Sequence, residues 1–219
     1  NMTPISTLRL RDHAYSNFTE KLLSRDIQPG QIVSQRELVE LTGMPLGAIR
    51  EMVPRLEADG LIKTVSKRGL QVLSIDVKLV RDAFQLRSII ESEAIAEFCT
   101  AAPKKEIENL ENQHQKLRKE ASFSVSSDIL KTAQQIDWNF HELIVDRMEN
   151  ALISDTYRVN TIKIRLIRNS DTRMLPELVV SVLDEHLAVI AALKACDTQG
   201  AVAALQTHIY SAKRRALGM

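Results

Sequence analysis

The chain has 219 residues, 44% of them hydrophobic, which is enough for one or two domains with a substantial apolar core. Its 7 glycines and 6 prolines allow few turns, so a fold of many short strands is excluded and helices are favoured. The net charge of +1 excludes a strongly basic chain, although residues 1–73 carry a slight excess of Lys and Arg over Asp and Glu.

The N-terminal part predicts short helices separated by clear stops. Apolar residues recur at roughly helical spacing over residues 6–25. Ser34 with Glu37 three residues later forms a capping-box pattern, and Gly43 is a typical C-cap residue. A second short helix is expected over residues 46–59, where Pro54 predicts either a kink or a later start.

Two β-prone runs follow, at residues 61–65 and 70–73. The hairpin turn between them carries Lys67 and Arg68 at its tip. Helix, helix, turn, helix and β-hairpin is the order of a winged helix-turn-helix, which places one helix in the major groove of DNA. We therefore expect a DNA-binding domain over residues 6–74, with the basic wing reaching the DNA backbone or minor groove.

Five segments carry a family pattern: QPGQIV (28–33), REL (36–38), AIRE (48–51), RLEADGLI (55–62) and RG (68–69). This pattern resembles the DNA-binding domain of GntR-family bacterial transcription regulators. In that family, residues matching Arg36 and Arg50 contact DNA, and the wing glycine matching Gly69 enters the minor groove. This chain has Pro45-Leu46 where the family usually places Ser/Thr-Arg, so the resemblance implies an altered operator sequence.

Helical periodicity dominates the rest of the chain, residues 75–219. Breaks at Pro103, at residues 122–124, at Asn150, at Leu175-Pro176 and at Asp197 divide it. Six helices of this length predict an antiparallel bundle, so the fold class is mainly α. The expected helices cover residues 76–101, 103–120, 124–147, 150–169, 175–195 and 198–216.

Three of the five histidines join one carboxylate in a candidate metal site. Asp137 and His141 are four residues apart and share a helix face, while His186 and His208 lie in apolar stretches of later helices. Such nitrogen and oxygen donors suit a divalent metal. The residues alone equally allow a helical hydrogen bond and ordinary core histidines. His13 and His114 lie in polar surroundings and are expected to stay outside the site.

Five further segments carry a second pattern: LRSIIE (86–91), DWNFH (137–141), ENAL (149–152), EHLAVI (185–190) and THI (207–209). They resemble the FCD effector domain of the FadR subfamily of GntR regulators, and six helices resemble its VanR group. The resemblance implies that Asp137, His141, His186 and His208 bind a divalent metal. Zinc is expected, with nickel and manganese as alternatives, because imidazole-rich sites suit zinc or nickel.

Open positions on such a metal suit a small carboxylate or hydroxy-acid effector. Arg87 matches a family arginine that faces the pocket, and arginine binds carboxylates through two nitrogens. Asn160 and Arg165 are further candidate effector residues, although both positions also fit an exposed polar helix face.

These observations predict a ligand-responsive transcription repressor that binds a palindromic operator as a homodimer and is released by a small organic acid. Two alternatives remain: a metal-dependent enzyme acting on such an acid, and a constitutive DNA-binding protein with a structural metal. No general base is evident beside the metal ligands, so we expect no catalysis.

The remaining sequence features concern location and cysteines. We find no secretory leader and no apolar run long enough to span a membrane, so a cytoplasmic protein without membrane contact is expected. Cys99 and Cys196 form no CxxC pair and are expected as buried free thiols.

Overall fold

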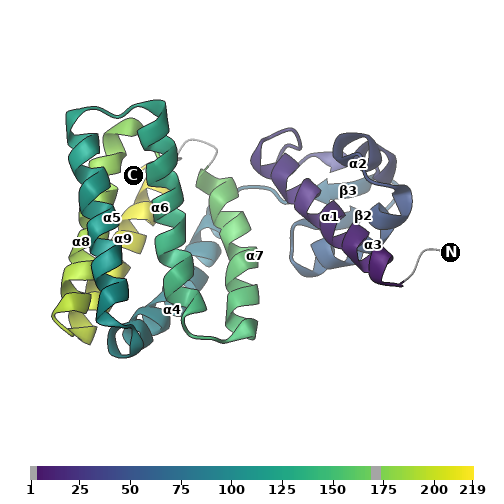
Figure 1. The fold of residues 1–219 in the computed structure, drawn as a ribbon. Helices are drawn as coiled ribbons and strands as arrows, with labels where there is room; N and C mark the ends of the chain where they lie inside the picture. Colours follow the sequence, from purple (N-terminus) through teal and green to yellow (C-terminus); the bar gives the residue numbers. More distant parts are fainter. Residues whose placement is uncertain (1–3, 169–173) are drawn as a thin grey trace. The chain divides into compact units, whose positions relative to one another are not determined.

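A computed structural model describes residues 4–168 and 174–219 of the chain (Figure 1). The chain divides into two compact units, Asn1–Asp76 and Val77–Met219, and each is described separately. The boundary expected from the sequence, between residues 74 and 75, lies two residues before this division.

The first unit is a winged helix-turn-helix, as predicted. Its three helices pack on one another, and Phe18, Leu38, Ile49 and Leu56 are fully buried at their centre. The strands form one antiparallel sheet in the order β1-β3-β2. The helices are α1 (Pro4–Leu23), α2 (Gln35–Thr42) and α3 (Leu46–Ala58), and the strands are β1 (Ile32–Val33), β2 (Ile62–Val65) and β3 (Gly69–Val72).

Local signals explain where these helices begin and end. Both hydrogen bonds of the Ser34–Glu37 capping box are present, and Gly43 ends α2 in the left-handed conformation at φ 67°. α3 runs from Leu46 through Pro54, so the later start that Pro54 allowed is wrong. Proline has no N–H to bond the carbonyl of Arg50, four residues earlier. Pro54 and Arg50 are both exposed, so this carbonyl lies on the solvent side of the helix.

The wing contains a glycine that the backbone requires. Gly69 has φ 112°, and a Cβ atom there would lie 2.8 Å from the carbonyl oxygen of Val33 in β1. β1 was not predicted, because a two-residue strand gives no periodic signal. Its pairing with β3 holds the base of the wing, so Gly69 has a packing role of its own.

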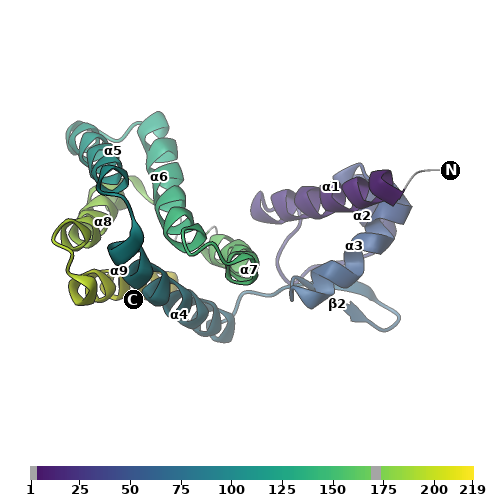
Figure 2. The same ribbon diagram turned by 60° about the horizontal axis from the view of Figure 1, so that its bottom comes forward.

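The second unit is an antiparallel bundle of six long helices, which confirms the predicted fold class (Figures 1 and 2). Neighbouring pairs close a ring in the order α4, α9, α8, α5, α6, α7 and back to α4, and α6 also contacts α4 and α8 across the interior. The helices are α4 (Val77–Ala101), α5 (Lys104–Phe123), α6 (Ser127–Asp146), α7 (Ala151–Arg168), α8 (Val179–Lys194) and α9 (Thr198–Ala216).

Capping residues define the helices that carry the candidate metal ligands. Ser126 caps α6 by accepting a hydrogen bond from the backbone N–H of Ile129, and Asp197 caps α9 in the same way through Gly200. The segment after Leu175 begins with a short 3-10 turn, η1 (Pro176–Leu178), before α8. These ends fix how α6, α8 and α9 present their buried faces.

Two minor expectations can be compared with the structure. None of the helices in residues 4–168 and 174–219 is long and apolar enough to cross a membrane. Both cysteines are free thiols, but only Cys99 is buried. The expectation for Cys196 was wrong, because this residue follows the end of α8 with φ 53° and is exposed in the turn before α9.

Candidate metal centre

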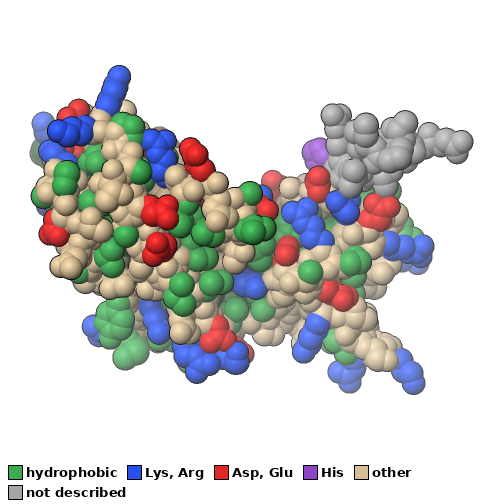
Figure 3. Space-filling view, turned by 90° about the horizontal axis from the view of Figure 1, so that it is seen from below, with side chains coloured by type: hydrophobic (Ala, Val, Ile, Leu, Met, Phe, Trp, Pro, Cys, Tyr) green, Lys and Arg blue, Asp and Glu red, His purple; other side chains and the backbone are tan. Residues whose placement is uncertain are grey.

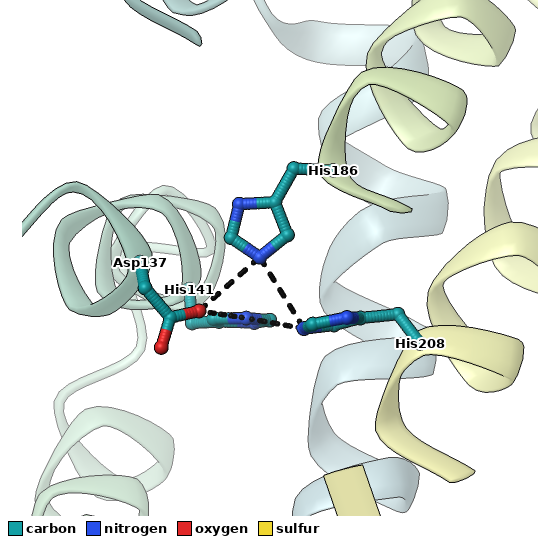
Figure 4. Close-up of side chains that lie close together, drawn as sticks. All are labelled: Asp137, His141, His186 and His208. Atoms are coloured by element: carbon teal, nitrogen blue, oxygen red, sulfur yellow. Dashed lines mark hydrogen bonds and ion pairs between the residues drawn. The ribbon is translucent and has the colours of Figure 1, made fainter. Parts of the chain in front are cut away.

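Four side chains converge in the interior of the six-helix bundle (Figure 4). Asp137 and His141 come from one face of α6, His186 from α8 and His208 from α9. None of the four is more than 3% exposed. One ligand atom from each lies within 4.8 Å of the others, so the structure brings together the whole set predicted from the sequence.

The facing atoms are Asp137 Oδ1 and the Nε2 atoms of the three histidines. Asp137 Oδ1 lies 3.5 Å from His141 Nε2 and 3.2 Å from His186 Nε2. His208 Nε2 completes the ring at 3.1 Å from His141 and 3.3 Å from His186. Donors around one ion at about 2.0–2.2 Å stand about 3 Å apart, so this set fits a zinc-like divalent ion.

The other ring nitrogen of each histidine also has a partner. His141 Nδ1 contacts Glu91 Oε1, and His208 Nδ1 contacts Glu185 Oε2. His186 Nδ1 lies 3.0 Å from Nε2 of His114. We refer to Glu91, His114 and Glu185 as the Nδ1 partners.

The sequence analysis missed all three Nδ1 partners. His114 was expected in polar surroundings, which is wrong: it is 0% exposed, and its Nδ1 lies 2.7 Å from the carbonyl oxygen of Leu110. Glu185 lies on a different helix face from its neighbour His186 and reaches His208 instead. Glu91 is fully buried on α4; it ends the segment LRSIIE that carries the FCD resemblance, but no role had been assigned to it.

Each carboxylate at the site is paired with an arginine. Arg87 Nε lies 2.6 Å from Glu91, Arg168 lies 2.9 Å from Asp137, and Arg215 lies 3.4 Å from Glu185. A fourth pair, Arg165 with Glu142 at 2.8 Å, lies beside them. Four negative charges therefore meet four positive ones around the histidines.

These pairs keep the carboxylates ionised despite burial. Burial opposes the charge of Glu91, but Arg87 and His141 outweigh it and lower the pKa of Glu91 to about 2. Burial likewise opposes the charge of Asp137, but the positive charge of Arg168 and the neighbouring rings of His141 and His186 hold the pKa of Asp137 well below its ordinary value. Asp137 is thus an anionic donor at neutral pH.

The three histidines are divided by their surroundings. Burial holds the pKa values of His186 and His208 well below the ordinary value, so both are neutral and suited to bind a cation. Burial also disfavours a charge on His141, but Glu91 outweighs it and raises the pKa of His141. A proton on His141 can therefore occupy the centre of the ring when no metal does.

A small cavity lies beside Asp137 and His141. It is lined by side chains from α4, α6 and α7, including Arg87, Arg165 and Arg168. Its volume is about 20 Å³, which holds a single water molecule. Arg87 and Arg165 were predicted to face such a pocket, and Arg168 is an addition that the sequence analysis missed.

Asn160 does not line this cavity. Its side-chain amide donates a 2.9 Å hydrogen bond to the backbone carbonyl of Ala83, and the residue is 4% exposed. The contact ties α7 to α4, which explains a buried asparagine without any effector. The structure therefore gives no basis for the effector contact that was expected of Asn160.

Comparison with known proteins identifies this bundle. Residues 82–211 match the family model of the FCD domain. The chain belongs to the FCD-domain family. The match includes all four converging side chains and the three Nδ1 partners, and it leaves the winged helix-turn-helix outside.

Relatives and solved structures to which this FCD-domain chain is similar carry the names of transcription regulators. YdhC of Bacillus subtilis, named as an uncharacterized HTH-type transcriptional regulator, is 26% identical over 62% of the chain. LgoR of Escherichia coli, named as a probable HTH-type transcriptional regulator, is 20% identical over 90% of the chain. These matches span 59% and 64% of the two relatives' lengths. A GntR regulator structure from Rhodococcus has a TM-score of 0.72 at 16% identity, covering 95% of this chain and 97% of that one.

The residues expected to contact DNA in this FCD-domain chain are spread over the first unit. Arg36 on α2, Arg50 on α3 and the wing cations Lys67 and Arg68 are all exposed. Arg50 Nε lies 3.4 Å from Gln35 Oε1, which holds it beside the start of α2. Lys and Arg side chains stand on the projecting lower part of this unit in Figure 3. These groups are available to a partner outside the protein.

Proposed function

We propose that this FCD-domain protein is a DNA-binding repressor whose affinity for its operator is set by a small organic acid bound at a divalent metal. Asp137, His141, His186 and His208 would hold the ion, most readily zinc. The metal would supply a Lewis-acidic centre with positions left for a carboxylate. The protein's own residues supply the charge balance that selects such a ligand.

The charge balance is the observation that carries this proposal. The four carboxylates around the ring and cavity are each matched by an arginine at 2.6–3.4 Å. With neutral histidines the site is uncharged, so a divalent ion leaves a net charge of about +2 in a buried place, which is costly. An anion removes that cost. A dicarboxylate cancels the charge fully, and a monocarboxylate cancels half of it.

The cavity size supports a role in switching. A space of about 20 Å³ holds one water molecule, so a bound organic acid would require the side chains that line it, among them Arg87, Arg165 and Arg168, to rearrange. Arg165 and Arg168 lie near the end of α7, and Arg87 lies on α4, the helix that follows directly after the DNA-binding unit. Binding of the acid would then favour one arrangement of α4 and α7 over another, which coupling to DNA binding requires.

A larger groove is a weaker candidate for the acid. It has a volume of about 650 Å³ and lies between α5 and α6. Its charged lining comprises one cation, Lys116, two acidic residues, Glu120 and Asp146, and Glu142, which is already paired with Arg165. This excess of negative charge disfavours a carboxylate ligand, so size alone does not identify the effector site.

The output of the switch would be the first unit. As a homodimer, the protein would place two copies of α3 about one DNA turn apart on a palindromic operator. Arg36 and Arg50 would contact the major groove, and Lys67, Arg68 and Gly69 would form the wing contact.

The test is a fluorescence-anisotropy titration of labelled DNA from the protein's own promoter region. Zinc-loaded protein is expected to bind this DNA, and a panel of mono- and dicarboxylates should include members that release it. His208→Ala should bind the DNA but not respond to the acids. If zinc-loaded wild-type protein binds the acids but never changes its DNA affinity, the regulatory proposal is wrong.

A purely structural metal is the second candidate, because all four donors are almost completely buried. In that case removing the metal lowers the melting temperature but leaves acid binding unchanged. In the regulatory proposal both fall together, since a ligand that binds only the loaded native state adds to its stability.

A further inference from the structure

His114 is the one histidine near the site that does not face the ring. It comes from α5, which supplies none of the four converging donors, and its Nδ1 lies 2.7 Å from the carbonyl oxygen of Leu110. A carbonyl oxygen only accepts, so Nδ1 of His114 must carry a proton. His114 is fully buried and its Nδ1 proton is donated to this carbonyl, so in the neutral ring the Nε2 atom is an acceptor.

This polarity passes directly to a ring donor. His114 Nε2 lies 3.0 Å from His186 Nδ1, so His186 donates its Nδ1 proton there. The Nε2 atom of His186 is then a bare lone pair, and it lies 3.2 Å from Asp137 Oδ1. Two electron-rich atoms at this separation repel unless a cation lies between them. The series of hydrogen bonds from Leu110 through His114 to His186 therefore keeps the Nε2 atom of His186 unprotonated, as metal binding requires.

Carboxylates fix the position of the ring proton in the other two histidines in the same way. A carboxylate oxygen of Glu91 accepts from His141 Nδ1, and one of Glu185 accepts from His208 Nδ1. Each carboxylate is itself held by an arginine, Arg87 in one case and Arg215 in the other. All three rings thus have Nδ1 engaged outward and Nε2 directed inward.

We propose that Glu91, His114 and Glu185 are positioning residues that fix the tautomers of His141, His186 and His208 so that all three Nε2 atoms face a bound cation. The inference rests on the proposed metal site and adds a requirement to it. Having three histidines at the site is not sufficient, because a histidine with its proton on Nε2 turns an N–H group, and not a lone pair, towards the ion. Because His114 is a neutral partner, it fixes the tautomer of His186 without adding the charge that a third carboxylate would bring.

The first test uses His114→Leu, which removes the acceptor and keeps a side chain of similar bulk. Zinc affinity, measured by competition with a chromogenic chelator, should fall about 10–100-fold. In long-range proton–nitrogen NMR spectra of the metal-free protein, His186 should move its proton from Nδ1 to Nε2, where Asp137 accepts it. His114→Gln, whose side-chain carbonyl can accept from His186, should recover part of the affinity.

The second test does not depend on a fully buried residue. Glu185 and Asp184 are neighbours on α8, each is paired with an arginine, and their side chains are 22% and 48% exposed. Only Glu185 contacts a histidine. Glu185→Ala should lower zinc affinity about 10-fold or more, whereas the matched control Asp184→Ala should not change it. The two variants should have similar melting temperatures in the metal-free form, so that a difference in zinc affinity does not reflect a difference in stability.

The outcomes separate this inference from the proposed function. If wild-type protein binds no zinc, the metal site itself is wrong, and the inference goes with it. If wild-type protein binds zinc and Glu185→Ala and His114→Leu bind it within about twofold of wild type, only the positioning inference is overturned. If Asp184→Ala weakens zinc as much as Glu185→Ala does, the effect is general electrostatics and the inference is also overturned.

Discussion

The two units of this protein differ in where their candidate functional polar side chains lie, on the surface in one and in the interior in the other. In the winged helix-turn-helix, the candidate functional side chains Arg36, Arg50, Lys67 and Arg68 are exposed. In the FCD bundle, the corresponding groups are buried: among the described residues, the eight buried polar or charged ones all lie in the second unit. One region is built to meet an external partner, and the other to enclose a small one.

This difference predicts how substitutions should behave. An exposed cation acts independently, so removing it changes one contact and leaves the fold intact. A buried group is paired on several sides, so removing it leaves its partners unsatisfied. Variants of these exposed cations in the first unit should therefore change DNA binding alone, and variants of buried polar groups in the second should change metal binding, acid binding and stability together.

The largest effect is expected from His208→Ala. Loss of one of four donors should weaken zinc binding at least about 100-fold, more than loss of an outer partner, and acid binding should fall with it. DNA affinity of the metal-free protein should remain within about twofold of wild type, because α9 lies in the other unit. Chelator competition measures the zinc affinity, and fluorescence anisotropy measures the DNA affinity. A parallel loss of metal-free DNA binding would contradict the separation of the two units.

Acid should destabilise the metal-free bundle. His186 and His208 have folded-state pKa values well below 6.5, so unfolding takes up protons once pH falls below that ordinary value. Glu91 has a folded-state pKa of about 2 against 4.5, so its contribution is present above pH 4.5 and is lost as pH falls towards 2. The raised pKa of His141 acts in the opposite sense and offsets part of the histidine effect.

The expected loss between neutral pH and about pH 4 is a few kcal/mol, measured by urea unfolding of the metal-free protein. Saturating zinc should remove most of the histidine part of this loss until the metal dissociates. A metal-free bundle whose stability does not change over this range would mean that the buried histidines are not held neutral.

Gly69→Ala should affect only the first unit. The residue has φ 112°, and the added Cβ would meet Val33 oxygen at 2.8 Å, so we expect a loss of about 1–3 kcal/mol. Gly47→Ala is the matched control, because Gly47 lies in α3 with nothing within 4 Å of its added Cβ. It should be neutral or stabilise by about 0.5–1 kcal/mol. Thermal unfolding compares the two, and equal losses would contradict the close approach to β1.

The smallest effects are expected at the wing tip. Lys67→Ala and Arg68→Ala should each weaken DNA binding less than tenfold and uniformly across sequences. Each should also reduce the salt dependence of binding by about one unit of slope if the residue contacts a phosphate. Zinc affinity should not change. Salt titrations by anisotropy give the slope, and a loss confined to one operator sequence would instead indicate a base contact.

The same contrast explains what the sequence could predict. Helix ends, the capping box and the Asp137–His141 pair all depend on neighbours within one element, and all were visible as spacing. The Nδ1 partners connect residues 23, 50 and 72 positions apart on different helices, which no periodicity links. They could not be read from the sequence as contacts.

His114 was the exception, because a signal existed. Its direct neighbours are polar, which suggested a polar environment. At helical spacing, however, it continues the stripe of Leu110, Leu117 and Ala121, which α5 buries against the bundle. A histidine inside such a stripe is better judged by residues three and four positions away than by its adjacent residues.

The central claim is that the metal, rather than the arginines, gives the FCD bundle its affinity for an organic acid. Arg87, Arg165 and Arg168 are already neutralised by carboxylates, so they should not retain an anion alone. Calorimetric titration of dicarboxylates into zinc-loaded and metal-free protein tests this directly. Our account predicts binding to the loaded protein and a loss of at least about tenfold without metal. Equal affinity for both forms would contradict it.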